Sequence, residues 1–468
     1  MAQRPVLGLI VGNRAGFPDA LVVEGRAALL RRLEELGVDV VAPDESLTRL
    51  GAVETWDDAQ RCARLFRAEA ERIDGILVSL PNFGDEKGIA DAIRLAGLNV
   101  PILVHAFPDD FENLTFERRR DAFCGKVSVC NNLTQVGARF SLTSVHTLDP
   151  ADDEFRDDLQ RFVATCRVVR GLRGARLGMV GTRPDAFRTV RFSEKLLEAS
   201  AISVSVIDLS DVHGRVDRLS DGDPRIARKL EDIRTYVTVK GVPEEPLVGM
   251  ARFAVVLDGW MQDNGLQGVA IQCWDSMQRN FGFSSCGIMS LMSDNLMPAA
   301  CETDVTGLVA MHALKLASGT PSSLADWNNN YGRERDKCVF WHCGYFAKSF
   351  VPDLVMGQHA SPDLPNSWGM LHGRASSGPV TFARITTDDV QGQIRAYVGE
   401  GRMTDDPLDT YGTRAVVEIP GLQKLLRHIC RNGFEHHVAM NRSLVADSVD
   451  EAFSTYMGWQ VYRHGAEA

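Results

Sequence analysis

Short apolar runs alternate with amphipathic segments between residues 6 and 106. The apolar runs are rich in Val, Ile and Leu and predict strands at residues 6–11, 38–42, 75–80 and 101–106. Between them, apolar side chains recur at helical spacing, which predicts helices at residues 21–36, 57–72 and 85–96. Strands and helices that alternate in this way are typical of βαβ units around a parallel sheet.

A second alternating series begins near Gly171. Its predicted strands are at residues 175–181, 202–209 and 269–274. Its predicted helices are at residues 189–200, 223–240, 246–264 and 304–317. Asp304 stands at the start of the last of these helices, where its carboxylate can cap the first turn. The series therefore predicts a second α/β domain.

The pattern becomes β-rich after residue 335. Short β-like segments are predicted at residues 338–343, 379–387, 393–398 and 414–419, and two late helices at residues 421–431 and 446–457. The predicted fold class is therefore α/β, with two Rossmann-like α/β domains that contain parallel sheets and a C-terminal β-rich, barrel-like domain with helical additions. The expected domains are residues 1–170, 171–325 and 326–468. The polar stretch between Phe111 and Asp158 is interpreted as a connection or an interface region.

The charge, the apolar runs and the cysteine pattern of the chain disfavour several classes of partner and site. The chain has 468 residues and a formal net charge of −11, which disfavours broad contact with nucleic acid or an anionic membrane. No apolar run reaches the roughly 18 residues of a membrane span, and no signal-peptide pattern opens the chain. The ten cysteines include no CxxC motif, so reduced thiols in a cytoplasm are expected. The sequence also lacks GxGxxG and GxSxG, which disfavours a dinucleotide site and a serine-hydrolase elbow.

Two carboxylates and a pair of histidines are the main candidates for chemistry. Glu302 follows an apolar and small-residue stretch, Asp326 stands in Leu-Ala-Asp-Trp-Asn, and the adjacent His436 and His437 lie near the C-terminus. If these groups converge, their oxygen ligands and single imidazole suit Mn²⁺ or Mg²⁺ better than Zn²⁺. Each also has an ordinary explanation. Glu302 can simply precede a helix, Asp326 can organise a turn, and paired histidines are more often structural.

Other residues could contact a small ligand. Gln272 and Trp274 share one face of a predicted strand, where an amide beside an aromatic ring could hold a sugar; an ordinary buried Trp is the alternative. Asn13 and Arg14 follow the first predicted strand, at the edge where ligands of parallel sheets gather. Further histidine-bearing segments are residues 341–344, His359 and residues 371–374. The adjacent His342 and Cys343 are not expected to form a nucleophile–base pair, since neighbouring side chains rarely align for it.

Together these segments resemble a known family. The order α/β, α/β, β-rich, combined with Ala-Cys-Glu302-Thr-Asp, Leu-Ala-Asp326-Trp and Glu-His-His437-Val, resembles the L-fucose isomerase and L-arabinose isomerase superfamily. Three further phrases look like its fucose-isomerase-like branch, namely residues 340–344, 378–384 and 397–401. The resemblance covers essentially the whole chain.

The resemblance implies roles for individual residues. Glu302 and Asp326 look like the two metal-binding carboxylates, which in the family also act as acid and base, and His437 looks like the metal-binding histidine. Asn13, Arg14 and Gln272 lie where the family places sugar-contacting groups. The arabinose branch has another metal histidine in the region of His359. The implied cofactor is Mn²⁺, with Mg²⁺ and Co²⁺ as alternatives, and the implied assembly is a homo-oligomer, a trimer or a hexamer.

The expected activity is the interconversion of an aldose and a ketose through an enediol. The implied substrate is a free pentose, a 6-deoxyhexose or a modified, for example sulfonated, hexose. Arg14, Arg183, Lys348 and Arg374 are the basic candidates for binding an anionic tail. Two other classes stay open at this point: a sugar-binding or sensor module, and a metal-dependent epimerase or lyase that acts on sugar acids.

Overall fold

A computed structural model describes residues 4–358 and 367–466. His359 lies outside these described residues. Contacts between residues divide the chain into two compact units. The first unit runs to Arg170 and also includes Thr455–Met457. The second unit contains the other residues from Gly171 onward. The predicted three-domain division therefore stays a prediction, and each unit is described by itself.

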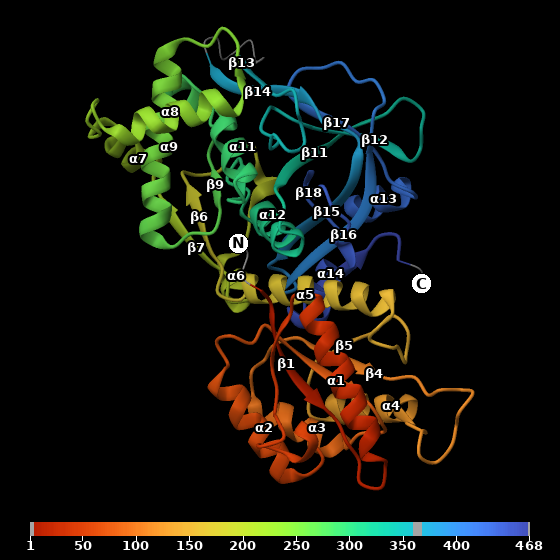
Figure 1. The fold of residues 1–468 in the computed structure, drawn as a ribbon. Helices are drawn as coiled ribbons and strands as arrows, with labels where there is room; N and C mark the ends of the chain where they lie inside the picture. Colours follow the sequence, from red (N-terminus) through yellow and green to blue (C-terminus); the bar gives the residue numbers. More distant parts are fainter. Residues whose placement is uncertain (1–3, 359–366, 467–468) are drawn as a thin grey trace. The chain divides into compact units, whose positions relative to one another are not determined.

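The first unit is built on a parallel sheet of five strands in the order β2-β1-β3-β4-β5 (Figure 1). These strands are β1 (Val6–Val11), β2 (Asp39–Val41), β3 (Gly75–Leu80), β4 (Ile102–Ala106) and β5 (Ser141–Leu142). All residues of β1, β3 and β4 are buried, as expected for a parallel sheet that is covered on both faces.

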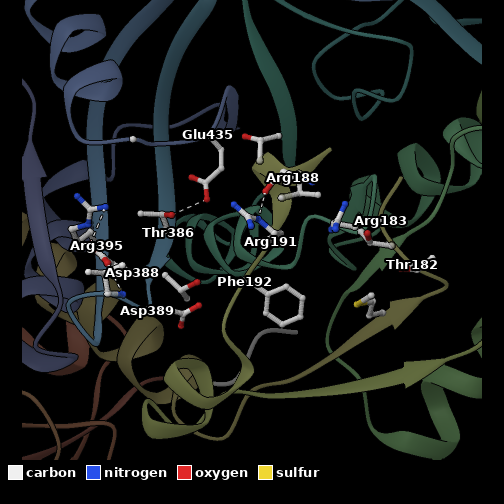
Figure 2. Close-up of a pocket in the computed structure, with 17 residues that line it drawn as sticks. Thr182, Arg183, Arg188, Arg191, Phe192, Thr386, Asp388, Asp389, Arg395 and Glu435 are labelled. Carbon is white, nitrogen blue, oxygen red and sulfur yellow. Dashed lines mark hydrogen bonds and ion pairs between the residues drawn. The ribbon is translucent and has the colours of Figure 1, made fainter. Parts of the chain in front are cut away.

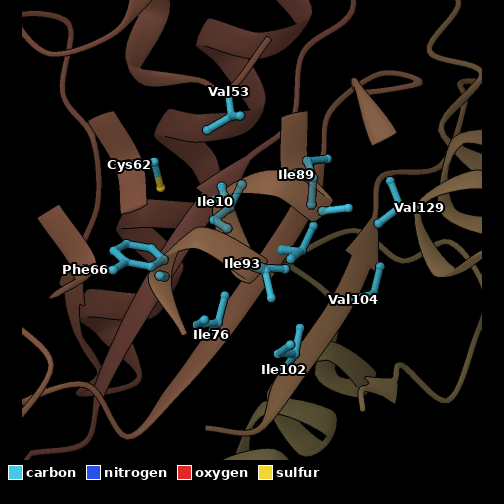
Figure 3. Close-up of a cluster of buried hydrophobic side chains, with 14 of the residues drawn as sticks. Ile10, Val53, Cys62, Phe66, Ile76, Ile89, Ile93, Ile102, Val104 and Val129 are labelled. Carbon is cyan, nitrogen blue, oxygen red and sulfur yellow. The ribbon is translucent and has the colours of Figure 1, made fainter. Parts of the chain in front are cut away.

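Helices cover both faces of this sheet. α1 (Asp19–Glu35) and α5 (Asp153–Leu172) contribute to one apolar cluster with Leu7, Leu9 and Leu77 of the strands. α2 (Trp56–Ala68), α3 (Glu86–Ala96) and α4 (Ala122–Gln135) contribute to the other cluster, which Figure 3 shows around Ile10, Phe66 and Ile93. The unit thus has two apolar cores, one on each side of a single sheet.

The stretch from Phe111 to Asp158 is not merely a connection. It contains α4, β5 and the start of α5. The buried positions of α4 include Gly125 and Lys126 beside Val129 and Leu133, so the apolar periodicity of this helix is weak. Sequence patterning missed the helix because a small residue and a hydrogen-bonded lysine occupy positions where apolar residues are expected.

The second unit begins with a parallel sheet of four strands in the order β10-β9-β6-β7. Its strands are β6 (Arg176–Val180), β7 (Ser203–Ile207), β9 (Val269–Ile271) and β10 (Ala299–Cys301). The accompanying helices are α6 (Glu194–Ala199), α7 (Leu209–Asp217), α8 (Pro224–Tyr236), α9 (Glu244–Asn264), α10 (Ser276–Phe281) and α11 (Cys286–Asp294). The helix predicted at residues 189–200 is instead a 3₁₀ turn at Arg188–Val190 followed by the short α6.

The β-rich part closes into a six-stranded antiparallel barrel. The pairing runs β16-β15-β18-β11-β12-β17, and β17 pairs back onto β16. The barrel strands are β11 (Ser322–Asn330), β12 (Lys337–His342), β15 (Gly378–Asp388), β16 (Gln393–Thr404), β17 (Thr413–Glu418) and β18 (His437–Asn441). The same sheet continues through β8 (Thr238–Val239), β13 (Val355–Gln358), β14 (Trp368–Arg374) and β19 (Gln460–Arg463). The predicted fold class is confirmed.

One helix joins the parallel sheet to the barrel. α12 (Val305–Ser318) contacts β9 and β10 on one side and β11, β15 and β18 on the other. Its residues from Val305 to Leu314 are all buried, which explains why it is apolar around most of its circumference. The helix predicted at residues 304–317, with Asp304 as its cap, is confirmed. The remaining helices are α13 (Leu422–Arg431) and α14 (Ala446–Glu451).

Within residues 4–358 and 367–466, no helix combines the length and the apolar character that crossing a bilayer requires.

Phe66 tests the core that lies on the α2 face of the first sheet. Its ring is fully buried and lies close to Gly8 of β1. We expect Phe66→Ala to destabilise the first unit by roughly 3–5 kcal/mol, because the substitution leaves a cavity. Val23→Ala on α1 is the control, since Val23 is 47% exposed. Thermal unfolding should show a lower midpoint for Phe66→Ala alone, and equal midpoints for the two variants would contradict this account of the core.

Candidate metal centre and active site

Glu302 lies directly after β10, where the chain turns into α12. Glu302 and Thr303 have backbone φ angles of 60° and 54°, in the left-handed region that non-glycine residues rarely adopt. Each such residue costs about 1–2 kcal/mol in an L-peptide. Asp304 then caps α12, because its side chain accepts a hydrogen bond from the Gly307 amide at 2.8 Å. Two consecutive strained residues place the Glu302 side chain, a kind of strain that clusters at functional sites.

Asp326 and His437 are cross-strand partners. They pair directly where β11 runs antiparallel to β18. Asp326 therefore lies inside a strand that continues to Asn330, and it does not organise a turn, which was its ordinary explanation from the sequence. Residues opposite one another in an antiparallel pair have Cβ atoms about 4.5–5.5 Å apart, so the register alone places this carboxylate beside this imidazole.

The three predicted ligands converge on one point. The Nε2 atom of His437 lies 3.3 Å from the Oε2 atom of Glu302 and 3.5 Å from the Oδ1 atom of Asp326. Both carboxylate oxygens are buried, and neither has a hydrogen-bond partner among the described residues. Buried polar atoms are nearly always satisfied in native proteins, so two unpaired oxygens beside one imidazole nitrogen call for a ligand. The donor set of two carboxylates and one imidazole fits a divalent cation.

A buried ionic network holds His437 in place. Its Nδ1 atom lies 2.8 Å from the Oδ2 atom of Asp304. Arg384 of β15 is also fully buried; its guanidinium binds both oxygens of Asp304 and, through Nε at 3.0 Å, the Oε2 atom of Glu435. An ionised carboxylate can only accept hydrogen bonds, so Nδ1 of His437 is the donor and Nε2 is the atom free to act as a ligand.

The charges of this network set the pKa values. Burial alone raises the pKa of Asp304, but the Arg384 guanidinium and His437 outweigh burial and hold it well below its ordinary value. Burial lowers the pKa of His437, yet its hydrogen bond to Asp304 and the nearby negative charges of Asp304 and Glu302 raise it overall to about 10. Burial raises the pKa of Asp326. The site therefore offers a permanent anion that orients His437 and a carboxylate whose proton affinity is increased.

Two further histidines lie beside these ligands. The ligating atoms of Glu302, His342 and His437 all lie within 4.8 Å of one another, and those of Asp326, His436 and His437 form a similar group. His342 ends β12, and its Nε2 atom is buried without a hydrogen-bond partner among the described residues. His436 is more exposed, with its Nε2 atom 3.7 Å from Asp326. The structure thus brings His342 closer to the candidate centre than its sequence neighbourhood suggested.

The predicted sugar-contacting residues are not all placed at this centre. The Oε1 atom of Gln272 accepts a hydrogen bond from the Thr182 amide at 2.9 Å, so its amide ties β9 to the end of β6. Trp274 is 39% exposed and packs against Phe187. Asn13 and Arg14 belong to the first unit, where Asn13 is buried between Glu54 and Asn82. Their contact with substrate stays a prediction.

The basic residues proposed for an anionic tail have different surroundings. Arg14 pairs with Glu86 and stacks on Phe83, 4.1 Å from the ring centre. Arg374 donates to the backbone carbonyls of Asp405 and Asp406. The ammonium of Lys348 lies 5.7 Å from the ring centre of Tyr236. Arg183 lines a cavity of the second unit.

Sequence reasoning missed the roles of Asp304, Arg384 and Glu435. Asp304 was expected only as a helix cap, and the other two stood inside quoted phrases without an assignment. A signal was nevertheless present, because Arg384 alternates with Val380 and Phe382 on one face of a strand. A charged residue on an apolar strand face is seldom buried unless it is paired.

Two family models and several known proteins match this chain. The model of the fucose/sulfoquinovose isomerase N-terminal domain matches residues 8–173, and that of the L-fucose isomerase C-terminal domain matches residues 341–464. The sulfoquinovose isomerase of Priestia aryabhattai is 23% identical over 406 residues, 86% of this chain and 86% of the relative. That of Alkalicoccus urumqiensis is 22% identical over 307 residues, 65% of this chain and 68% of the relative.

The chain belongs to the fucose isomerase-like superfamily. It is an aldose–ketose isomerase, and its substrate is a sugar. The family is metal-dependent, and the groups around His437 are able to hold an ion. Membership in this family confirms the resemblance seen in the sequence, and it favours the isomerase over the sugar-binding module.

Arg384 tests the ionic network. We expect Arg384→Met to lower the free energy of unfolding by roughly 3–5 kcal/mol, because it leaves Asp304 and Glu435 buried without their cation. Arg72→Met is the matched control. It breaks an exposed pair with Glu69 and should cost at most about 1 kcal/mol. Urea unfolding followed by circular dichroism measures both, and a loss no larger than that of the control would contradict the role of Arg384.

Proposed function

We propose that this isomerase interconverts a 6-sulfonated aldohexose of the sulfoquinovose type and the corresponding ketose. The observation that carries the catalytic part of this proposal is the convergence of the unpaired Glu302 and Asp326 oxygens on Nε2 of His437. Three separate elements supply these side chains, so their meeting is a property of the fold. The sulfonated substrate is supported by relatives that carry the name sulfoquinovose isomerase.

Glu302, Asp326 and His437 would hold the metal. Hard oxygen donors with one imidazole favour Mn²⁺, with Mg²⁺ and Co²⁺ as alternatives, over Zn²⁺. When bound, a divalent cation polarises the carbonyl and hydroxyl oxygens of the sugar and offsets the negative charge of the enediolate. The oriented His437 supports this donor set, since its Nδ1 is already committed to Asp304.

Glu302 and Asp326 would also move the protons. Isomerisation requires a base to take the C2 proton of the aldose and return a proton to C1, while a second group handles the hydroxyl proton. The raised pKa of Asp326 brings its proton affinity closer to neutral pH, which suits reversible proton transfer. Glu302 and Asp326 both lie within 3.5 Å of Nε2 of His437, close enough together for the two carboxylates to serve neighbouring carbons of one bound sugar.

We also propose that the chain forms a homo-oligomer, a trimer or a hexamer, in the cytoplasm. Phe111, Leu114, Phe116 and Phe123 are exposed within one short stretch of the first unit, and exposed apolar clusters of this kind are typical of interfaces. None of the ten cysteines forms a disulfide, which agrees with a reducing compartment. Sedimentation velocity at micromolar concentration would determine the number of subunits, and a monomer would refute the assembly.

The activity can be tested directly. The metal-stripped protein with Mn²⁺ restored should convert the sulfonated aldohexose to its ketose, followed by NMR in D₂O. Deuterium should appear at the carbon that exchanges its proton, because the proposed base takes a proton to and from solvent. An epimer of the starting aldose as the sole product would instead indicate the epimerase alternative.

Glu302→Gln tests the proposed base and ligand. We expect its turnover to fall by about 10² or more, because the variant loses a ligand and a proton-transfer group while keeping a similar shape. Glu334→Gln is the control, since Glu334 forms an exposed pair with Lys337. Circular dichroism and the unfolding midpoint should be unchanged in both. Full turnover by Glu302→Gln would refute the assignment.

Metal affinity should depend on pH. The pKa of His437 without metal is about 10, so Nε2 must release a proton before it can bind a cation. Below that pKa the apparent affinity for Mn²⁺ should therefore rise about tenfold for each unit of pH increase. Electron paramagnetic resonance of free Mn²⁺ between pH 6 and pH 8 measures this without turnover. His437→Gln should bind more weakly and with a flatter dependence, and a flat profile for the unmodified protein would contradict the prediction.

A further inference from the structure

The second unit contains a cavity of about 730 Å³ at the C-terminal end of β6. Ligands of open parallel sheets bind at this end of the strands. Its wall includes Thr182 and Arg183 after β6, residues 188–192, and Thr386 to Val390 at the end of β15. Figure 2 shows Arg183, Arg188 and Arg191 on one side of this cavity and Thr386, Asp388 and Arg395 on the other.

The cavity carries an excess of unpaired positive charge. Asp388 is paired with Arg395 at 3.3 Å, and Glu435 is paired with the buried Arg384. Arg183, Arg188 and Arg191 have no ion pair with a described carboxylate. Arg183 donates only to the carbonyls of Pro184 and Asp185, and Arg191 only to the carbonyl of Arg188. Of the acidic residues in the wall, Asp389 alone lacks a described cationic partner, so guanidinium groups predominate.

The cavity borders the candidate metal centre. Thr303 in its wall is the residue directly after Glu302, and consecutive Cα atoms are about 3.8 Å apart. Glu435, also in the wall, binds Arg384, which in turn binds Asp304 beside His437. The adjacency of Glu302 and Thr303 is the structural link between the centre and the cavity, and the far end of a six-carbon sugar held at Glu302 is the part that can extend toward the arginines.

We infer that this cavity binds the anionic group on C6 of the substrate, and that Arg188 and Arg191 are the residues that recognise it. The chemistry required is a tetrahedral oxyanion, either a sulfonate or a phosphate. Guanidinium groups bind such oxyanions through two parallel N–H donors, and bringing an anion between arginines relieves their mutual repulsion. The inference rests on the proposed isomerase function and names the part of the site that selects an anionic sugar.

A second cavity shows that basic residues in a wall do not by themselves indicate an anion site. It has a volume of about 440 Å³ and is lined by α8 and α9 residues, among them Arg225, Arg228 and Lys229. There Arg225 is paired with Asp223 and Lys229 with Asp258, so most of the positive charge is compensated. Arg228→Gln is therefore a matched control, because it removes an arginine from a cavity that should not bind the substrate.

The experiment compares the double variant Arg188→Gln/Arg191→Gln with the unmodified protein on two sugars, the 6-sulfonated aldohexose and its uncharged 6-deoxy counterpart. We expect kcat/KM for the sulfonated sugar to fall by roughly tenfold or more, mainly through KM, since a remote charged contact contributes to ground-state binding. The value for the 6-deoxy sugar should stay within about twofold. Arg228→Gln should leave both values unchanged. Equal losses on both sugars would overturn the inference.

Two further measurements distinguish a sulfonated from a phosphorylated substrate, and a failure of this inference from a failure of the proposed function. A 6-phosphorylated aldohexose that is used better than the sulfonated one, with the same loss in the double variant, supports the cavity and corrects the proposed substrate. If the unmodified protein isomerises none of the sugars, the proposed function fails. Calorimetric titration of the two sugars then still tests whether the cavity binds the anionic group. Binding of the sulfonated sugar but not the 6-deoxy sugar, lost in the double variant, supports the inference, and no preference for the anion overturns it.

Discussion

The second unit depends on the contact of Asp304 with Arg384 and His437. One buried carboxylate caps α12, accepts from the guanidinium of β15 and orients the imidazole at the start of β18. Removing either cation would leave a charge in the interior that costs several kcal/mol, so the three elements are held in a single arrangement. The parallel sheet, the helix and the barrel meet at this residue, which explains why no boundary between them separates compact units.

The same contact fixes the geometry of the candidate site. Asp304 is held by Arg384, and the two residues before Asp304, Glu302 and Thr303, turn the chain with left-handed backbone angles. The barrel register then sets Asp326 opposite His437. Neither feature is a local preference of the sequence. Both are imposed by packing, since rare backbone angles persist only where the surrounding structure determines them.

The sequence predicted the class of fold and the central strands and helices well, because Val-, Ile- and Leu-rich runs such as β1 and β3 carry a strong periodic signal. It failed where buried positions hold small or polar residues, as in α4, and where a short turn replaced a helix at Arg188. The convergence of Glu302, Asp326 and His437 came from the resemblance. Spacing along the chain could not give it, because the contacts join residues more than a hundred positions apart.

The charges around His437 explain why a divalent cation suits this place. Four carboxylates, those of Glu302, Asp304, Asp326 and Glu435, face one guanidinium and one protonated imidazole. Arg384 binds the inner pair of carboxylates, Asp304 and Glu435, and Nδ1 of His437 also binds Asp304. The outer pair, Glu302 and Asp326, has no such cation of its own among the described residues, and its two carboxylates repel each other. A divalent cation held by Glu302, Asp326 and Nε2 of His437 would supply more positive charge than the proton it replaces. The inner network thus fixes the orientation of the His437 imidazole. The outer carboxylates attract the cation and so favour replacement of the Nε2 proton by the metal.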